Sequence, residues 1–384
     1  MSTTGETSPR VVIAHDFTTE YAGSERIIAT AATNFPEAPF WTIAGRRSVA
    51  ERMGVAAHFS TVLPSRERLL SHHKALAPLY PAIVRAKRLP AADVLLTSSF
   101  AFAHGFATRN NAPQVCYCYT PPRFAWSMAQ EYGENLTRSR LGHTAFKGFA
   151  AAMRYLDRRA ARRVTRYVAE SHYIADQIRR FYGKSAEVVY PPVDCELFRP
   201  SDNGGGGDYF LFCGRLIEPY KRPGIVIEAF RDLDRKLVVA GDGPAYRDLR
   251  ELAGPNVSFA GHLSDEELVP LMQGCLATIF PSVDDFGLVP VESMACGRPV
   301  LAFARGGATE TVVPGKTGEL FGEQTARAVR AAVEEFQPDA YDPKAIRLHA
   351  EAWDAPRFRD QIRKIVLETA AGVPAQTSGS PMAT

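Results

Sequence analysis

The sequence of 384 residues contains no run of about 18 uncharged apolar residues, the length that a transmembrane helix needs. The residues from Met1 to Pro9 are polar and include no apolar signal core. No pair of Cys-x-x-Cys motifs occurs, so a zinc site is not expected and the six cysteines are interpreted as reduced, buried thiols. We therefore expect a cytoplasmic protein.

The Gly-x-Gly-x-x-Gly fingerprint of dinucleotide-binding proteins is also missing. The stretch Gly241-Asp-Gly-Pro-Ala-Tyr246 lacks the third glycine, and the loop around Gly23 does not match the pattern, which disfavours a dehydrogenase.

Charge is distributed unevenly along the chain. Residues 1–200 contain 26 basic and 16 acidic side chains, a net charge of +10, and the remainder has a net charge of −7. This asymmetry favours two domains with different partners.

Apolar runs of strand length alternate with segments of helical periodicity. The predicted strands are 10–15, 40–44, 94–97, 115–119, 164–169, 186–189, 209–213, 236–240, 257–259, 277–280 and 299–303. The near-continuous apolar character of these runs predicts parallel sheets covered on both faces. The run from Gly204 to Gly207 predicts a linker. We predict an α/β protein of two doubly wound, Rossmann-like domains facing across a cleft, with domains at 1–200 and 208–355 and a C-terminal helix and disordered tail at 356–384.

The stretch from Phe280 to Val300 contains the strongest candidate site. A predicted strand leads into a turn with Asp284 and Asp285, and a helix begins near Leu288. The N–H groups and the dipole of that helix favour a phosphate there. Glu292 in its first turns is placed to accept hydrogen bonds from ribose hydroxyls, and Asp284 from hydroxyls of a sugar. Ordinary helix capping by these acids is the alternative, above all for Asp285.

Two cations, Arg215 and Lys221, follow the predicted strand 209–213. In a cleft they would neutralise a diphosphate leaving group as negative charge develops on it. Solvated surface charge is the alternative.

A second group of polar residues follows the first predicted strand. His15 and Asp16 stand at its end, and Gly23 lies at the start of a predicted helix for which Ser24 is the expected N-cap. His15 is interpreted either as a cleft residue or as a packing histidine with satisfied nitrogens.

In order along the chain, these stretches and others resemble retaining glycosyltransferases of family four with the GT-B fold. Within that family they are similar to the group that contains bacterial O-antigen mannosyltransferases, over about Val11 to Phe321. The matching motifs are Ala22-Gly-Ser-Glu-Arg26, Tyr119-Thr-Pro-Pro-Arg-Phe-Ala-Trp126, Tyr190-Pro-Pro-Val-Asp194, Gly214-Arg-Leu with Lys221-Arg222, Gly241-Asp-Gly-Pro244, Asn256 to Gly261, Asp284-Asp-Phe-Gly287, Pro290-Val-Glu292, and Gly297-Arg-Pro-Val300 with Gly306-Gly307.

The resemblance implies transfer of a hexose, mannose in that group, from a nucleotide-diphosphate sugar such as GDP-mannose to a glycan or lipid-linked acceptor of the cell envelope. It implies retention of the anomeric configuration and no cofactor. Arg215 and Lys221 match the pair on the diphosphate, and Glu292 matches the second glutamate of the Glu-x7-Glu motif on the ribose. Asp284 replaces the first glutamate and is one methylene shorter. The remaining implied donor-binding residues are Gly23, Gly214, Gly241, His262, Phe286, Gly287, Leu288 and Val289. The acceptor-side candidates are His15, Asp16 and Arg123.

One departure concerns catalysis. Related sequences usually have histidine where this chain has Tyr119, which donates a hydrogen bond but is no base at neutral pH. In retaining enzymes of this type the departing phosphate helps to deprotonate the acceptor, so a protein base is not obligatory. No metal is expected, because Arg215 and Lys221 supply the charge. Asp232-Leu-Asp234 spells Asp-x-Asp but lies at the wrong end of its predicted strand for the cleft.

From Arg138 to Arg166 the chain contains nine basic residues and a single acid, Asp157, with apolar residues between them. This stretch is either a helix that lies peripherally on the inner, anionic face of a membrane or a solvated helix face. Nucleic acid is disfavoured, since no binding motif for it accompanies the charge. Two other functions remain open: a nucleotide-sugar epimerase, and a nucleotide-sugar-binding protein that has lost turnover.

Overall fold

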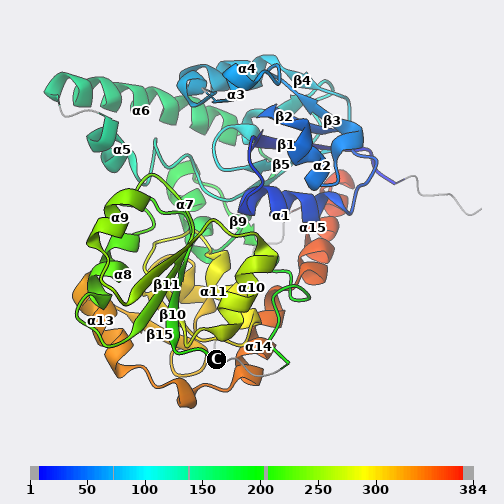
Figure 1. The fold of residues 1–384 in the computed structure, drawn as a ribbon. Helices are drawn as coiled ribbons and strands as arrows, with labels where there is room; N and C mark the ends of the chain where they lie inside the picture. The colour runs from blue at the N-terminus through cyan, green and yellow to red at the C-terminus, as the bar shows by residue number, and fades with distance from the viewer. Residues whose placement is uncertain (1–7, 72, 137–138, 203–205, 375–384) are drawn as a thin grey trace, which may run out of the picture. The chain divides into compact units, whose positions relative to one another are not determined.

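The computed structural model describes residues 8–71, 73–136, 139–202 and 206–374. The chain forms two compact units (Figure 1). Unit 1 comprises Met1–Tyr190 and Phe358–Thr384, and unit 2 comprises Pro191–Arg357. Gly204 and Gly205 of the predicted linker and the end of the predicted tail lie outside the described residues.

The division differs from the predicted boundaries at 200 and 356. The segment after Tyr190 packs in unit 2, where Arg347 Nη1 donates to the Phe198 carbonyl at 2.6 Å. The last helix, α15 (Ala355–Ala370), packs mostly in unit 1. There the buried Arg166 pairs with Glu187 at 2.6 Å and with Glu368 of α15 at 3.1 Å.

Unit 1 contains a parallel sheet of seven strands in the order β3-β2-β1-β5-β7-β8-β9. The strands are β1 (Val11–Thr18), β2 (Phe40–Gly45), β3 (Phe59–Thr61), β5 (Val94–Ser99), β7 (Gln114–Cys118), β8 (Arg166–Ala169) and β9 (Ala186–Val188). The residues of β5, β7 and β8 are buried throughout, because helices cover both faces of a parallel sheet. A short pair of strands, β4 (Arg88–Leu89) and β6 (Ala107–Thr108), lies apart from this sheet.

The helices of unit 1 are α1 (Gly23–Ala32), α2 (Arg47–Arg52), α3 (Glu67–Ser71), α4 (Tyr80–Ala86), α5 (Ala129–Leu136), α6 (Arg140–Ala161) and α7 (His172–Tyr182). The predicted N-cap of α1 was wrong: Ala22 caps the helix, and the Glu25 side chain completes the cap by accepting from the Ala22 N–H at 3.0 Å. Helix α6 is long, and its first half extends beside α5, away from the strands of its unit (Figure 1).

Unit 2 contains a second parallel sheet in the order β12-β11-β10-β13-β14-β15. The strands are β10 (Tyr209–Cys213), β11 (Lys236–Ala240), β12 (Val257–Gly261), β13 (Thr278–Phe280), β14 (Val300–Phe303) and β15 (Gly318–Phe321). The helices are α8 (Pro223–Phe230), α9 (Tyr246–Leu252), α10 (Asp265–Gly274), α11 (Leu288–Ala295), α12 (Ala308–Thr311), α13 (Ala326–Glu335) and α14 (Pro343–Ala350). One core of buried aliphatic and aromatic side chains joins the sheet to α8 and α13.

Five of the six cysteines are buried, as predicted, and Cys213 is half-buried. All six are free, and burial raises the pKa of Cys116, Cys275 and Cys296 to about 12 each. Among the described residues, no helix is both long and apolar enough to cross a membrane.

Candidate functional site

In unit 2, the loops that follow β10, β11 and β12 meet through glycine backbones. Gly214 N donates to the Ala240 carbonyl at 3.0 Å, and Gly241 N to the Gly261 carbonyl at 2.7 Å. A Cβ added at Gly241 would lie 1.9 Å from the Gly214 oxygen, so only glycine fits there. A Cβ at Gly214 would meet nothing within 4 Å, which leaves room for a ligand beside its backbone.

The loop between β13 and α11 packs closely against the backbone of a second pair of glycines, Gly306 and Gly307. Gly307 N donates to the Asp284 carbonyl at 2.9 Å, and a Cβ added at Gly307 would lie 2.3 Å from the Cα of Phe286. Phe286 itself is buried. Gly287, with φ of 87°, then turns the chain into the helix. Gly307 thus leaves room for the backbone of this loop, and Gly287 allows the turn at its end.

Helix α11 begins directly at this turn. Leu288 and Val289 are its first residues and are half-buried, and the N-cap residue is Gly287, which has no side chain to cap the helix. The first N–H groups of a helix have no partner within it, and together with the dipole they favour an anion. The predicted phosphate position therefore coincides with the start of a helix whose N-cap residue is glycine.

Lys221 and Asp284 are brought together although 63 residues separate them. The Lys221 ammonium forms an ion pair with the Asp284 carboxylate, and the two side chains are 21% and 12% exposed. The ammonium also lies over the rings of Tyr220 and Phe280, at 5.2 and 5.9 Å from their centroids. A lysine in this position carries a poorly solvated charge.

The other predicted residues of unit 2 differ in exposure. Glu292 is on the buried side of α11 and is 4% exposed. Arg215 is exposed in the loop after β10 and forms no ion pair with any residue in the described part of the chain. His262 is exposed directly after β12, where Gly261 has a φ of 76°. The Asp232 carboxylate pairs with Arg330 at 3.0 Å on the surface.

In unit 1, His15 is fully buried and both of its ring nitrogens have partners. Nδ1 lies 3.2 Å from the Ser98 carbonyl and 3.0 Å from Ser98 Oγ, and Nε2 lies 3.3 Å from Glu25 Oε1. A carbonyl only accepts, so Nδ1 carries a hydrogen, and a proton must also lie between Nε2 and the Glu25 carboxyl group. His15 and Glu25 thus form a buried, hydrogen-bonded pair.

The sequence did not single out Glu25 or Ser98 as site residues. Glu25 Oε2 accepts from the Ala22 N–H and from Ser24 Oγ, each at 3.0 Å, so this carboxyl group connects His15 to the start of α1. A glutamate at the third helical position is half of a capping box and was the available signal.

Tyr119 lies one residue beyond β7 and belongs to the same network. Its hydroxyl donates to the Ser24 carbonyl at 2.9 Å and accepts from Ser98 Oγ at 2.8 Å. Burial raises the pKa of Tyr119 well above the usual value of a phenol. The side chain is therefore neutral and positions the loop at Gly23 and Ser24.

Asp16 is fully buried and its carboxylate holds a backbone turn. It accepts four N–H groups, those of Phe100, Ala101, Phe102 and Ala103, at 2.6 to 2.8 Å. Its oxygens are thus occupied within unit 1. Arg123 is half-buried in the turn before α5, and Gly23 is half-buried as the first residue of α1.

Both units match models of known protein families. Residues 23–197 match the family model described as "Glycosyltransferase Family 4", and residues 195–352 match "Glycosyl transferases group 1". An uncharacterised glycosyltransferase of Methanocaldococcus jannaschii is 31% identical over 172 residues, which cover 44% of this chain and 48% of that protein. A D-inositol 3-phosphate glycosyltransferase of Mycobacterium leprae is 35% identical over 156 residues, which cover 35% of this chain and 36% of that protein. The chain thus matches about half or less of the length of these relatives.

Among solved structures, Anabaena HepE in complex with UDP superposes with a TM-score of 0.68 at 18% identity, covering 93% of this chain and 99% of that one. The two Rossmann-like units therefore have the GT-B fold. The chain contains a glycosyltransferase family 4 domain followed by a glycosyl transferases group 1 domain.

Proposed function

We propose that this protein is a retaining, metal-independent glycosyltransferase that moves a hexose from a nucleotide-diphosphate sugar to a glycan or lipid-linked acceptor. The observation that carries the proposal is in unit 2. There the start of α11, with glycine as its N-cap residue, and the poorly solvated Lys221–Asp284 pair lie on the loops at the carboxyl ends of β10 and β13. Ligands of doubly wound sheets bind at such ends.

The residues of unit 2 divide the work on the donor. Lys221 and the exposed Arg215 neutralise the diphosphate as it leaves, which makes a divalent ion unnecessary. The N–H groups at Leu288 and Val289 bind a phosphate, Glu292 accepts from the ribose, and Asp284 accepts from the hexose. Because Lys221 already pairs with Asp284, both residues change partners when the donor binds.

Unit 1 supplies the acceptor side. Tyr119 is neutral and hydrogen-bonded on both sides, so it orients the loop at Gly23 and Ser24 and does not remove a proton. The departing phosphate then takes the acceptor proton. HepE has been solved with UDP and with UDP-glucose, which is compatible with a nucleotide-sugar donor for this fold. For this chain we retain GDP-mannose as the first donor to test.

The basic helix α6 favours an acceptor at a membrane surface on the cytoplasmic side. Leu141 and Tyr155 of this helix are 86% and 66% exposed, and Leu136 at the end of α5 is 67% exposed. Exposed apolar residues beside Arg140, Lys147 and Arg154 are typical of a helix that lies on anionic lipid. Equal and negligible binding to anionic and neutral vesicles would exclude this surface.

Turnover tests the function directly. The full chain is incubated with GDP-, UDP-, ADP- and dTDP-hexoses, with and without a lipid-linked glycan acceptor, and the released nucleotide is measured. We expect release from one donor, dependent on acceptor, and at least 100-fold slower in Lys221→Ala, since one preorganised charge contributes about 10²–10³ in kcat. Acceptor-independent conversion of the sugar would indicate an epimerase. Tight donor binding without any release would indicate a binding protein, the function that Tyr119 favours.

A further inference from the structure

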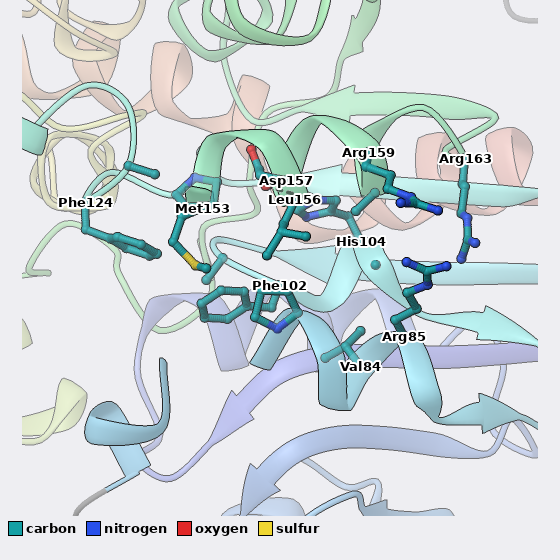
Figure 2. Close-up of a pocket in the computed structure, with 16 residues that line it drawn as sticks. Val84, Arg85, Phe102, His104, Phe124, Met153, Leu156, Asp157, Arg159 and Arg163 are labelled. Atoms are coloured by element: carbon teal, nitrogen blue, oxygen red, sulfur yellow. Dashed lines mark ion pairs between the residues drawn. The ribbon is translucent and has the colours of Figure 1, made fainter. Parts of the chain in front are cut away.

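Unit 1 contains a pocket that none of the predicted site residues lines. It lies between α4, α6 and the short 3₁₀ helix Ala103–Gly105, and its volume is about 60 Å³ (Figure 2). Its apolar lining includes Val84 and Phe102 at one side and Phe124, Met153 and Leu156 at another. At about 15 Å³ for each water-sized group, the volume has room for about four such groups. A short apolar segment therefore fits inside, and a whole lipid chain does not.

Three arginines stand at one end of this pocket. Arg85 comes from α4 and Arg159 from α6, and Arg163 follows α6 closely; Figure 2 shows their guanidinium groups gathered at the same side, away from Phe124 and Met153. All three are exposed, and within the described part of the chain none of the three guanidinium groups has a hydrogen bond or ion pair. Guanidinium groups that converge without a partner favour a bidentate anion such as a phosphate.

The carboxyl group of the lining does not neutralise these arginines, because it is already engaged. Asp157 Oδ1 pairs with His104 Nε2 at 3.0 Å, and its Oδ2 accepts from Trp126 Nε1 at 2.7 Å. Asp157 is 9% exposed and His104 is 4% exposed. Both oxygens of the Asp157 carboxylate are thus engaged, and the lining residues of the pocket include no other carboxylate that would neutralise the arginines.

We propose that this pocket binds the phosphate end of an anionic lipid. The phosphate lies across Arg85, Arg159 and Arg163, the first carbons of the chain lie against Val84, Phe102 and Leu156, and the rest of the chain leaves the pocket. The site is separate from the donor site of unit 2. This proposal rests on the proposed function in one respect: the bound lipid would be the lipid part of the lipid-linked acceptor.

The test uses probes without sugar or nucleotide, so its failure leaves the donor site of unit 2 untouched. Binding of n-octyl phosphate, below the concentration at which it forms micelles, is measured by isothermal titration calorimetry. Inorganic phosphate represents the anion alone, and n-octanol represents the chain alone. We expect n-octyl phosphate to bind at least tenfold more tightly than either. Equal affinity for inorganic phosphate, or no binding of n-octyl phosphate, would overturn the proposal.

Variants locate the site. Arg85→Gln/Arg163→Gln is expected to weaken n-octyl phosphate binding at least tenfold. The matched control, Arg109→Gln/Arg180→Gln, removes the same charge from exposed positions of unit 1 outside both the pocket and the basic stretch 138–166 and is expected to bind as the wild type does. Leu156→Gln is expected to reduce the advantage of n-octyl phosphate over inorganic phosphate. Thermal midpoints verify that each variant is folded, and equal weakening by the two double variants would overturn the assignment to this pocket.

Discussion

Replacing Lys221 with methionine removes one charge from the proposed donor site and keeps most of the side-chain volume. The Lys221 ammonium and the Asp284 carboxylate form an ion pair whose members are 21% and 12% exposed. Water screens such a pair poorly, so the substitution leaves Asp284 with a largely desolvated charge. We expect two effects, one on the stability of unit 2 and one on nucleotide binding.

The magnitudes follow from the contacts. A hydrogen bond to a charged group contributes about 1.5–3 kcal/mol, so the free energy of unfolding should fall by about 2 kcal/mol. The dissociation constant of the cognate nucleoside diphosphate should rise at least tenfold, because each 1.4 kcal/mol of lost phosphate contact corresponds to a factor of about 10. Lys221 must leave Asp284 to contact the phosphate, which keeps the effect on binding at the lower end of this range.

Lys236→Met is the matched control. Lys236 and Asp208 form a second lysine–aspartate pair in unit 2, at 2.7 Å, but they are 65% and 73% exposed. Exposed pairs contribute little, so neither stability nor nucleotide binding should change measurably. Urea denaturation measures the first quantity and calorimetric titration the second. If Lys221→Met bound the nucleotide as tightly as the Lys236→Met protein, the role given to Lys221 would be wrong.

Three further predictions concern single side chains. Gly307→Ala places a methyl group against the Phe286 backbone and should cost about 1–3 kcal/mol of stability together with donor binding. Asp16→Asn cannot accept all four N–H groups and should cost about 3 kcal/mol. The third concerns pH: burial disfavours the charged form of His104, but the hydrogen bond and charge of Asp157 outweigh it and raise the pKa of His104. Between these two pKa values the native state holds a proton that the unfolded state has lost. The stability that the His104–Asp157 pair contributes is therefore complete below the unfolded pKa of about 6.5 and is lost as the pH rises through the higher, folded pKa. His104→Gln should flatten that fall of stability with pH.

The first two of these predictions have a control variant, and the third has an outcome that would contradict it. Gly322→Ala adds a methyl group where nothing lies within 4 Å and should leave stability and donor binding unchanged. Asp176→Asn alters an exposed carboxylate of unit 1 and should change stability far less than Asp16→Asn. An unfolding free energy that falls between pH 6.5 and 9 with the same slope in the wild type and in His104→Gln would contradict the account of that pair.

Much of the fold follows from local pattern. Strands such as 209–213 and 236–240 were predicted to the residue, because a buried parallel strand is a short apolar run between turn signals. Strand β15 was missed, since Gly318-Glu-Leu-Phe321 is a short edge strand that begins with glycine. Helix α14 was missed as well, although Asp342 caps it and Pro343 is its first residue.

The site is less visible in the sequence because its contacts are long-range. The spacing of residues does not reveal that Lys221 lies against Asp284, or that Asp16 accepts N–H groups more than 80 residues away. The basic stretch shows the same limit. Arg166 stands at its end, yet it is a buried strand residue paired with two glutamates, and Asp157 is a buried partner of His104 and Trp126.

The most direct test of the donor site is the stability of the full chain in the presence of GDP, UDP, ADP and dTDP, compared with the Arg215→Ala/Lys221→Ala variant. A nucleotide at 100 times its dissociation constant adds about 2.7 kcal/mol to the free energy of unfolding. We predict an increase of this size with one nucleoside diphosphate in the wild type and its loss in the variant. An increase of equal size in both proteins, or none with any nucleotide or whole nucleotide-sugar, would contradict a donor site built on these two cations and helix α11.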